Sequence, residues 1–116
     1  MKFGDYIRTV RLDLQDKDRR YSVRQVAFKV GIEPSYLSKV ERGLEAPPSV
    51  STIERLAEVL QENADILLAL AGKVSPDLTA AIVRRPQLFS ELIRELNALP
   101  DHAVLRIVRE VRDGDW

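Results

Sequence analysis

Apolar residues recur at steps of three and four along nearly the whole chain of 116 residues. Phe3, Ile7 and Val10 begin the pattern, and this spacing places them on one face of an α-helix. The alternating pattern of a half-buried strand and the turn signals of a hairpin do not occur. The spacing therefore predicts an all-α fold.

Glycines, capping residues and prolines divide this pattern into eight predicted helices. Glycine ends a helix in the left-handed conformation, serine or asparagine caps the start of one, and proline is tolerated in its first turn. We expect five helices in a unit of residues 1–72 and three in a unit of residues 73–116. The residues that mark the boundaries are Ser22, Gly31, Pro34, Gly43, Ser49, Asn63 and Gly72, followed by Pro76, Pro86 and Pro100.

The composition excludes several classes of site. The chain has no cysteine and a single histidine, His102, so thiolate zinc sites, a cysteine nucleophile and a Ser-His triad are not expected. We predict no catalytic residue, no metal and no cofactor, in a protein that is not an enzyme. The longest apolar run, residues 66–71, is too short to span a membrane, and the first residues do not resemble a signal peptide. We therefore expect a cytoplasmic protein that does not associate with membranes.

Charge is distributed unevenly, although 18 basic residues balance 18 acidic ones. Residues 17–42 hold seven basic and three acidic residues, whereas residues 43–72 hold five acidic residues and one basic residue, Arg55. A locally basic segment is weak evidence for a polyanionic partner, because most charged stretches simply face solvent.

The most informative stretch is residues 22–43, which read SVRQVAFKVGIEPSYLSKVERG. We expect two short helices here, joined by a turn at residues 31–33. Ala27 is small enough for the second helix to cross the first closely, and Leu37 and Val40 face inward. A pair of helices joined in this way is a helix-turn-helix, whose second helix fits the major groove of DNA.

The motif residues of this chain lie within this pair and beyond its C-terminal end. They are Ser22, Ala27, Gly31-Ile32, Ser35-Tyr36-Leu37-Ser38, Glu41-Arg42-Gly43, Pro48-Ser49 and the run from Leu67 to Gly72. With these elements the chain resembles the Cro/C1-type (Xre-like) helix-turn-helix regulators of bacteria and phages, over residues 3–72. The resemblance implies a five-helix, lambda repressor-like DNA-binding domain, followed here by a small helical C-terminal extension. It also implies double-stranded DNA and a second copy of the chain as partners.

The resemblance assigns base-reading positions to Pro34, Ser35 and Lys39. Lys39 can donate to guanine O6 and N7, and Ser35 can bond several base edges; the alternative for Lys39 is a solvated side chain. Tyr36 either reaches a phosphate through its hydroxyl or packs its ring between helices. The predicted DNA-binding residues are Ser22, Arg24, Pro34, Ser35, Tyr36, Ser38, Lys39 and Arg42, with Lys17, Arg19 and Arg20.

The resemblance also pairs Arg11 with Glu41, an ion pair that ties the first helix to the end of the recognition helix. The chain departs from the family at Val23, where a phosphate-binding glutamine is common, and at residues 44–48, which are not basic. A short insertion between the first two helices, within residues 12–21, carries Lys17, Arg19 and Arg20. This basic stretch either replaces the missing phosphate contacts or belongs to a longer first helix with a solvated loop.

The last three predicted helices have broad apolar stripes, which we expect to be buried against another surface. They either fold back onto the N-terminal unit or pack against a second copy, and we favour the dimer. The predicted dimer interface consists of Leu88, Leu92, Leu96, Val104, Ile107 and Val111.

Three classes of function remain open. We predict a sequence-specific DNA-binding transcriptional regulator, a repressor that acts as a homodimer on an inverted-repeat operator. One alternative is an antitoxin-like protein that binds a protein partner through its C-terminal helices and regulates its own operon. The other is a protein-interaction module that no longer binds DNA.

Overall fold

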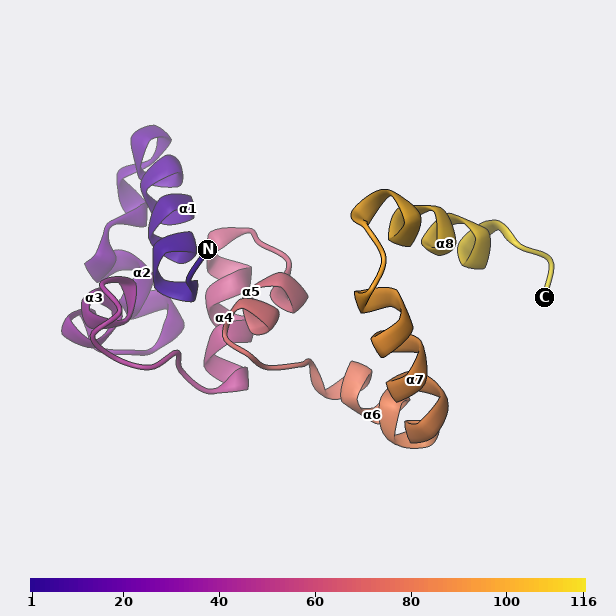
Figure 1. The fold of residues 1–116 in the computed structure, drawn as a ribbon. Coiled ribbons are helices and arrows are strands. Elements are labelled where there is room, and N and C mark those ends of the chain that lie inside the picture. The colour runs from indigo at the N-terminus through magenta and orange to yellow at the C-terminus, as the bar shows by residue number, and fades with distance from the viewer. The chain divides into compact units, whose positions relative to one another are not determined.

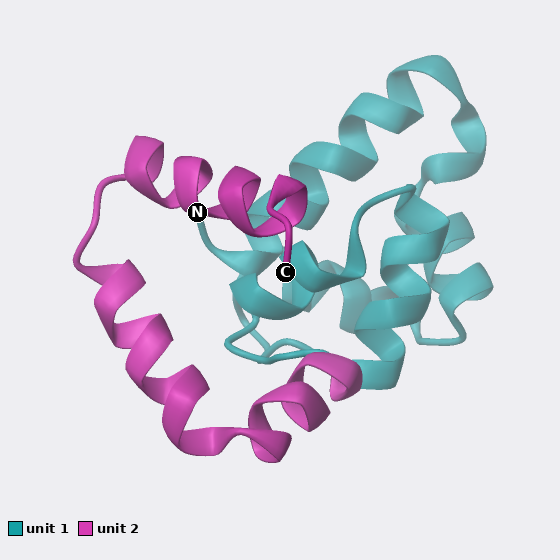
Figure 2. Ribbon diagram, turned by 90° about the vertical axis from the view of Figure 1, so that its right-hand side faces the viewer, with its two compact units in different colours: residues 1–75 teal, residues 76–116 magenta.

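The computed structural model describes residues 1–116 and contains eight α-helices, one short 3₁₀ helix and no strand (Figure 1). The all-α prediction is therefore confirmed. The chain divides into two compact units, residues 1–75 and residues 76–116 (Figure 2). The helices are α1 (Phe3–Lys17), η1 (Arg19–Tyr21, the 3₁₀ helix), α2 (Val23–Val30), α3 (Pro34–Glu41), α4 (Val50–Leu60), α5 (Ala64–Leu70), α6 (Pro76–Arg84), α7 (Pro86–Asn97) and α8 (Asp101–Asp113).

The helices of the first unit begin at the expected caps. The Ser22 hydroxyl accepts a hydrogen bond from the backbone N–H of Gln25, and the Asn63 side chain accepts one from the N–H of Asp65. Ser49 caps α4 in the same way. These bonds satisfy N–H groups that have no partner inside the helix. Local hydrogen bonding thus fixes where α2, α4 and α5 start.

Two different residues end helices in the left-handed conformation. Gly31 ends α2 with φ of 86°, as the sequence predicts, because glycine adopts this conformation without a steric penalty. Gln61 ends α4 with φ of 58°, although it is not glycine. The sequence carries no signal for this second turn.

The core of the first unit is built from one face of each of its five α-helices. The α3 helix contributes Leu37 and Val40, both of which are almost fully buried. Truncating a buried leucine to alanine usually costs about 2–5 kcal/mol, so this packing fixes which face of α3 points outward. The buried apolar residues are Phe3, Ile7, Val26, Ala27, Val30, Leu37, Val40, Ile53, Leu56, Ala57, Leu60, Leu67 and Leu68.

The segment between α1 and α2 differs from the expected insertion. The first helix runs on to Lys17, and only Asp18 and η1 separate it from Ser22. Leu14 continues the apolar stripe and packs against the core, which favours continued helix. The first helix is therefore longer than the expected one, and the residues after it form a 3₁₀ turn. The role of the basic stretch in phosphate contacts stays a prediction.

The second unit contains α6, α7 and α8 and has no buried residue. Its helices do touch one another. Phe89 and Ala81 line a hollow of about 220 Å³ at α6 and α7, and Leu96 and Val104 line one of about 370 Å³ at α7 and α8. No helix of either unit has the length and apolar character needed to cross a membrane.

Candidate nucleic-acid interface

The α2 and α3 helices and the turn between them form the helix-turn-helix. The backbone N–H groups of Gly31 and Ile32 both donate to the carbonyl of Ala27, at 2.9 and 3.0 Å. Pro34 then occupies the first turn of α3. Ala27 is fully buried and Ile32 packs against the core. The turn is therefore anchored by both hydrogen bonds and packing.

The outer face of α3 carries the predicted base-reading residues. Ser35 and Lys39 are exposed, and neither side chain forms a hydrogen bond or ion pair within the chain. Pro34 and Ser38 are partly buried. Arg42 is exposed, and its Nε donates a long bond of 3.4 Å to the carbonyl of Ser38. The helix thus presents one serine hydroxyl and two cations to the outside.

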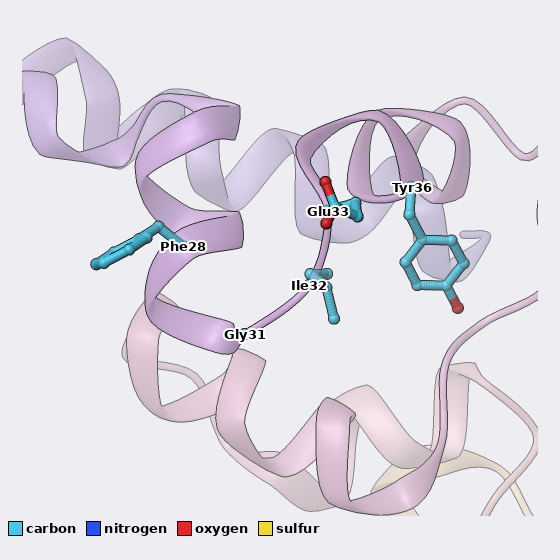
Figure 3. Close-up of a pocket in the computed structure, with 5 residues that line it drawn as sticks. All are labelled: Phe28, Gly31, Ile32, Glu33 and Tyr36. Atoms are coloured by element: carbon cyan, nitrogen blue, oxygen red, sulfur yellow. The ribbon is translucent and has the colours of Figure 1, made fainter.

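Tyr36 lies at the side of this face. Its ring packs partly against the core, and its hydroxyl has no hydrogen-bond partner in the chain. In Figure 3 the rings of Tyr36 and Phe28 lie on either side of Ile32, along an open hollow of about 530 Å³. The ring-packing alternative therefore describes Tyr36 within the chain, and the hydroxyl remains free for another partner.

Phe28 is a feature of this region that sequence reasoning missed. It projects from α2 and is 83% exposed. Helical spacing could have indicated this, because Val26, Ala27 and Val30 define the inner face of α2 and Phe28 lies opposite to them.

A buried ion pair holds the far end of α3. Arg11 Nε and Nη2 donate to the two carboxylate oxygens of Glu41 at 2.7 and 2.9 Å. Arg11 Nη1 also donates to Gln15 Oε1 at 3.1 Å and to the carbonyl of Tyr21 at 3.2 Å. Both charged side chains are almost fully buried, and a buried charge needs such complete partnering. The network connects α1, η1 and the last turn of α3.

Gly4 lets α1 approach the same end of α3. A Cβ atom at this position would collide with the backbone carbonyl oxygen of Val40 and would lie 2.8 Å from that of Glu41. These are backbone atoms, so they cannot rotate away as a side chain would. Sequence reasoning did not single out Gly4, because the constraint arises only where two distant helices meet.

The predicted basic stretch before α2 separates into paired and unpaired residues. Arg20 Nη2 lies 2.7 Å from Asp18 Oδ2, and Arg20 Nε also donates to both carboxylate oxygens. The hydrogen bond from the Arg20 side chain lowers the pKa of Asp18 to about 2. The side chains of Lys17 and Arg19 are exposed and make no ion pair. Two of the three predicted cations are therefore free for an anionic partner.

The two predicted residues at the start of α2 differ in their availability. Arg24 is exposed and has no ion pair. Ser22 is partly buried, and its hydroxyl oxygen accepts the capping bond from Gln25 at 3.2 Å. The hydroxyl hydrogen of Ser22 is not used by that bond.

The six residues of the predicted dimer interface lie on α7 and α8. Leu88, Leu92 and Val111 are 65%, 47% and 60% exposed. Leu96, Val104 and Ile107 are partly buried. An apolar stripe therefore remains open along both helices.

Comparison with known proteins bears on the first unit. Residues 17–67 match the helix-turn-helix family model. An uncharacterised HTH-type transcriptional regulator of Mycobacterium tuberculosis is 34% identical over 79 residues, which are 68% of this chain and 52% of that protein. The HTH-type transcriptional regulator SinR of Bacillus subtilis is 38% identical over 52 residues, 45% of this chain and 47% of that protein. The HTH-type transcriptional repressor RghR of B. subtilis is 31% identical over 72 residues, 62% of this chain and 50% of that protein.

The chain spans about half the length of the curated relatives it matches. No solved structure matches it. The residues that match the family model include α2, the turn and α3 in full. The members of this family are transcriptional regulators rather than enzymes. The resemblance predicted from the motif residues is thereby confirmed: the chain belongs to the Cro/C1-type (Xre-like) family of helix-turn-helix transcriptional regulators.

Proposed function

We propose that the chain is a sequence-specific repressor that binds an inverted-repeat operator as a homodimer. In this proposal residues 1–72 bind DNA and residues 73–116 form the dimer. The observation that carries it is the outer face of α3, where Ser35 and Lys39 have no partner within the chain while Leu37 and Val40 fix the inner face. Unpartnered polar groups on a short, firmly packed helix suit the edges of base pairs in a major groove.

Each outward residue has a role that its chemistry supports. Lys39 donates to guanine O6 and N7, and Ser35 bonds a base edge. Pro34 has no side-chain donor, so its contribution is apolar contact with a thymine methyl group. Ser38 is partly buried beside these residues, and its hydroxyl serves the same groove.

The remaining predicted residues are assigned to phosphates. All of them except Tyr36 lie outside α3, and phosphate contacts set position and orientation without reading sequence. Arg42 follows the end of α3, Arg24 lies in the first turn of α2, and Lys17 and Arg19 precede it. Tyr36 and Ser22 offer hydroxyl donors. Arg20 contributes least of the cations, because Asp18 already neutralises it.

The dimer is supported by the open apolar stripe of α7 and α8. Burying a leucine side chain contributes about 1.5–3 kcal/mol, and no leucine of the second unit is fully buried among its own helices. A second copy supplies the same stripe in a twofold arrangement, which buries one patch against its equivalent. A symmetric pair also presents two copies of α3, as an inverted repeat requires.

The experiment that tests the proposal is selection of duplexes from a random library by the purified chain. We expect enrichment of an inverted repeat whose half-site centres lie about one helical turn apart, roughly 34–36 Å. Footprinting on the enriched duplex should protect both half-sites. If the chain enriches no sequence over the input, the proposal of a sequence-specific regulator is wrong.

A further inference from the structure

Arg55 reaches from α4 to the end of α2, 25 residues earlier in the chain. Its Nε donates to the backbone carbonyl of Val30 at 3.0 Å, and its Nη2 donates to Thr52 Oγ1 at 3.3 Å. Thr52 is buried and also accepts from the Ser49 hydroxyl at 3.0 Å. A continuous chain of hydrogen bonds therefore runs from the cap of α4 through Arg55 to the last residue of α2.

The carbonyl of Val30 is where such a bond has most effect. The last four carbonyl oxygens of a helix receive no hydrogen bond from within it. A cation near them also interacts favourably with the helix dipole. Val30 immediately precedes Gly31, whose left-handed conformation starts the turn to α3. A guanidinium fixed at this carbonyl thus fixes the direction in which the chain leaves α2.

We propose that Arg55 is a positioning residue for DNA recognition, which sets the angle of the turn and hence the orientation of α3 against the bases. This inference rests on the proposed function. Arg55 is also the single basic residue of residues 43–72, which hold five acidic ones. The Arg55 side chain is exposed but is held by two bonds within the chain, so its proposed role lies in the hydrogen bonds to Val30 and Thr52.

A positioning role affects specific binding more than nonspecific binding. Contacts to base edges require α3 at one depth and angle, whereas attraction to phosphates tolerates small displacements. Arg55→Met keeps the length of the side chain and removes both bonds. Arg55→Lys keeps the charge and replaces the planar pair of donors by a single ammonium group. Thr52→Val removes the side-chain anchor of the guanidinium without touching it.

The test measures the affinity of each full-length variant for the duplex selected by the wild-type chain and for a scrambled duplex, over a series of salt concentrations. Arg55→Met should bind the selected duplex about tenfold more weakly, which corresponds to about 1.4 kcal/mol of binding free energy. Its affinity for the scrambled duplex and its salt slope should stay unchanged. Arg55→Lys and Thr52→Val should show the same pattern at smaller size. Arg94→Met, which removes an equal charge from α7, is the control and should bind both duplexes as the wild type does.

Two results would overturn the inference. A parallel loss on both duplexes, with a salt slope flatter by about 0.9, would make Arg55 a phosphate contact. Unchanged discrimination between the duplexes in variants that have lost thermal stability would make its role structural alone. A wild-type chain that selects no duplex would instead refute the proposed function, so the two failures are distinguishable.

Discussion

Lys39 is the side chain on which the proposed reading of sequence depends most. It is exposed on α3 and has no partner within the chain. Lys39→Ala should lower affinity for the selected duplex by about 1–3 kcal/mol and relax preference at one base pair per half-site. Fluorescence anisotropy with the selected duplex and its single-base variants measures both effects. If affinity for selected and scrambled duplexes falls equally, Lys39 contacts a phosphate.

Arg11 and Glu41 should respond differently to single and double replacement. Arg11→Met leaves the Glu41 carboxylate buried without its partner, and such a loss typically costs about 3–5 kcal/mol of stability. The double variant Arg11→Met with Glu41→Leu removes both charges and should be more stable than the single variant. Urea unfolding of each variant checks the order. A double variant that is less stable than both single variants would contradict it.

Gly4 should tolerate no side chain. The new Cβ of Gly4→Ala meets the carbonyl oxygens of Val40 and Glu41, so α1 and the end of α3 must separate. We expect a loss of about 1–3 kcal/mol, typical of overpacking. Arg8→Ala, on the exposed side of the same helix, is the control and should stay within about 0.5 kcal/mol of the wild type. Equal stability of Gly4→Ala and the control would show that the approach is looser than described.

At the scale of elements, the junction between α1 and α2 determines how many cations are free for DNA. Replacing Lys17 and Arg19 by alanine should weaken binding to all duplexes, with the salt slope flattened by about 0.9 for each lost contact. Asp18→Asn releases Arg20 and should strengthen binding to all duplexes and steepen the slope. Isothermal titrations over a salt series measure these slopes. A slope that neither change alters would place the junction away from DNA.

The pairing of Arg20 should persist over the whole physiological pH range. The pKa of Asp18 is lowered from 3.8 to about 2 by hydrogen bonding to Arg20. A carboxylate whose pKa is lower in the folded state stabilises it above the unfolded pKa, and this contribution is lost as the pH falls through about 2. Neutral or mildly acidic conditions therefore do not free Arg20, and Asp18→Asn remains the way to test it.

Much of the first unit could be predicted from the sequence, because its helix boundaries are set by local chemistry. Ser22, Asn63 and Gly31 act on residues within one turn, so their effect can be read without knowing the fold. Gly4 and Arg55 could not be identified in this way. Val40 and Val30, which Gly4 and Arg55 approach, lie 25 or more residues away in the chain, and only the packed structure brings them together.

The end of the first helix is an intermediate case. The family resemblance led us to expect an insertion within residues 12–21, and a longer first helix with a solvated loop was one of its two interpretations. Leu14 continues the apolar stripe, and the helix follows it to Lys17. The hydrophobic period was therefore the better guide to this boundary. The contacts of the recognition helix with DNA remain predictions, since they depend on a partner.

At the scale of the whole molecule, an experiment can distinguish the proposed dimer from the alternative, in which the C-terminal helices fold back onto the N-terminal unit of the same chain. Leu92→Asp with Ile107→Asp puts charges into the apolar stripe and should yield a monomer that retains the helices of residues 1–75 and binds the selected duplex weakly. Light scattering gives the mass and circular dichroism the helicity. The control is Arg94→Asp on α7, outside the predicted interface, which should leave the dimer intact.

Two outcomes would contradict the dimer through α7 and α8. If the wild type is already a monomer and the double variant loses helicity, the apolar stripe packs within its own chain. If a chain truncated after Gly72 remains a dimer, the interface lies in the first unit.

If the open stripe of α7 and α8 forms the proposed dimer, DNA binding depends on how much of the chain is present. In the proposed dimer these helices gain stability from association, and association follows mass action. In dilute conditions the population of dimers rises with the square of the chain concentration, so operator occupancy should rise more steeply than simple saturation. Under this proposal the target gene is transcribed while the chain is scarce, and it is repressed over a narrow range of rising chain concentration.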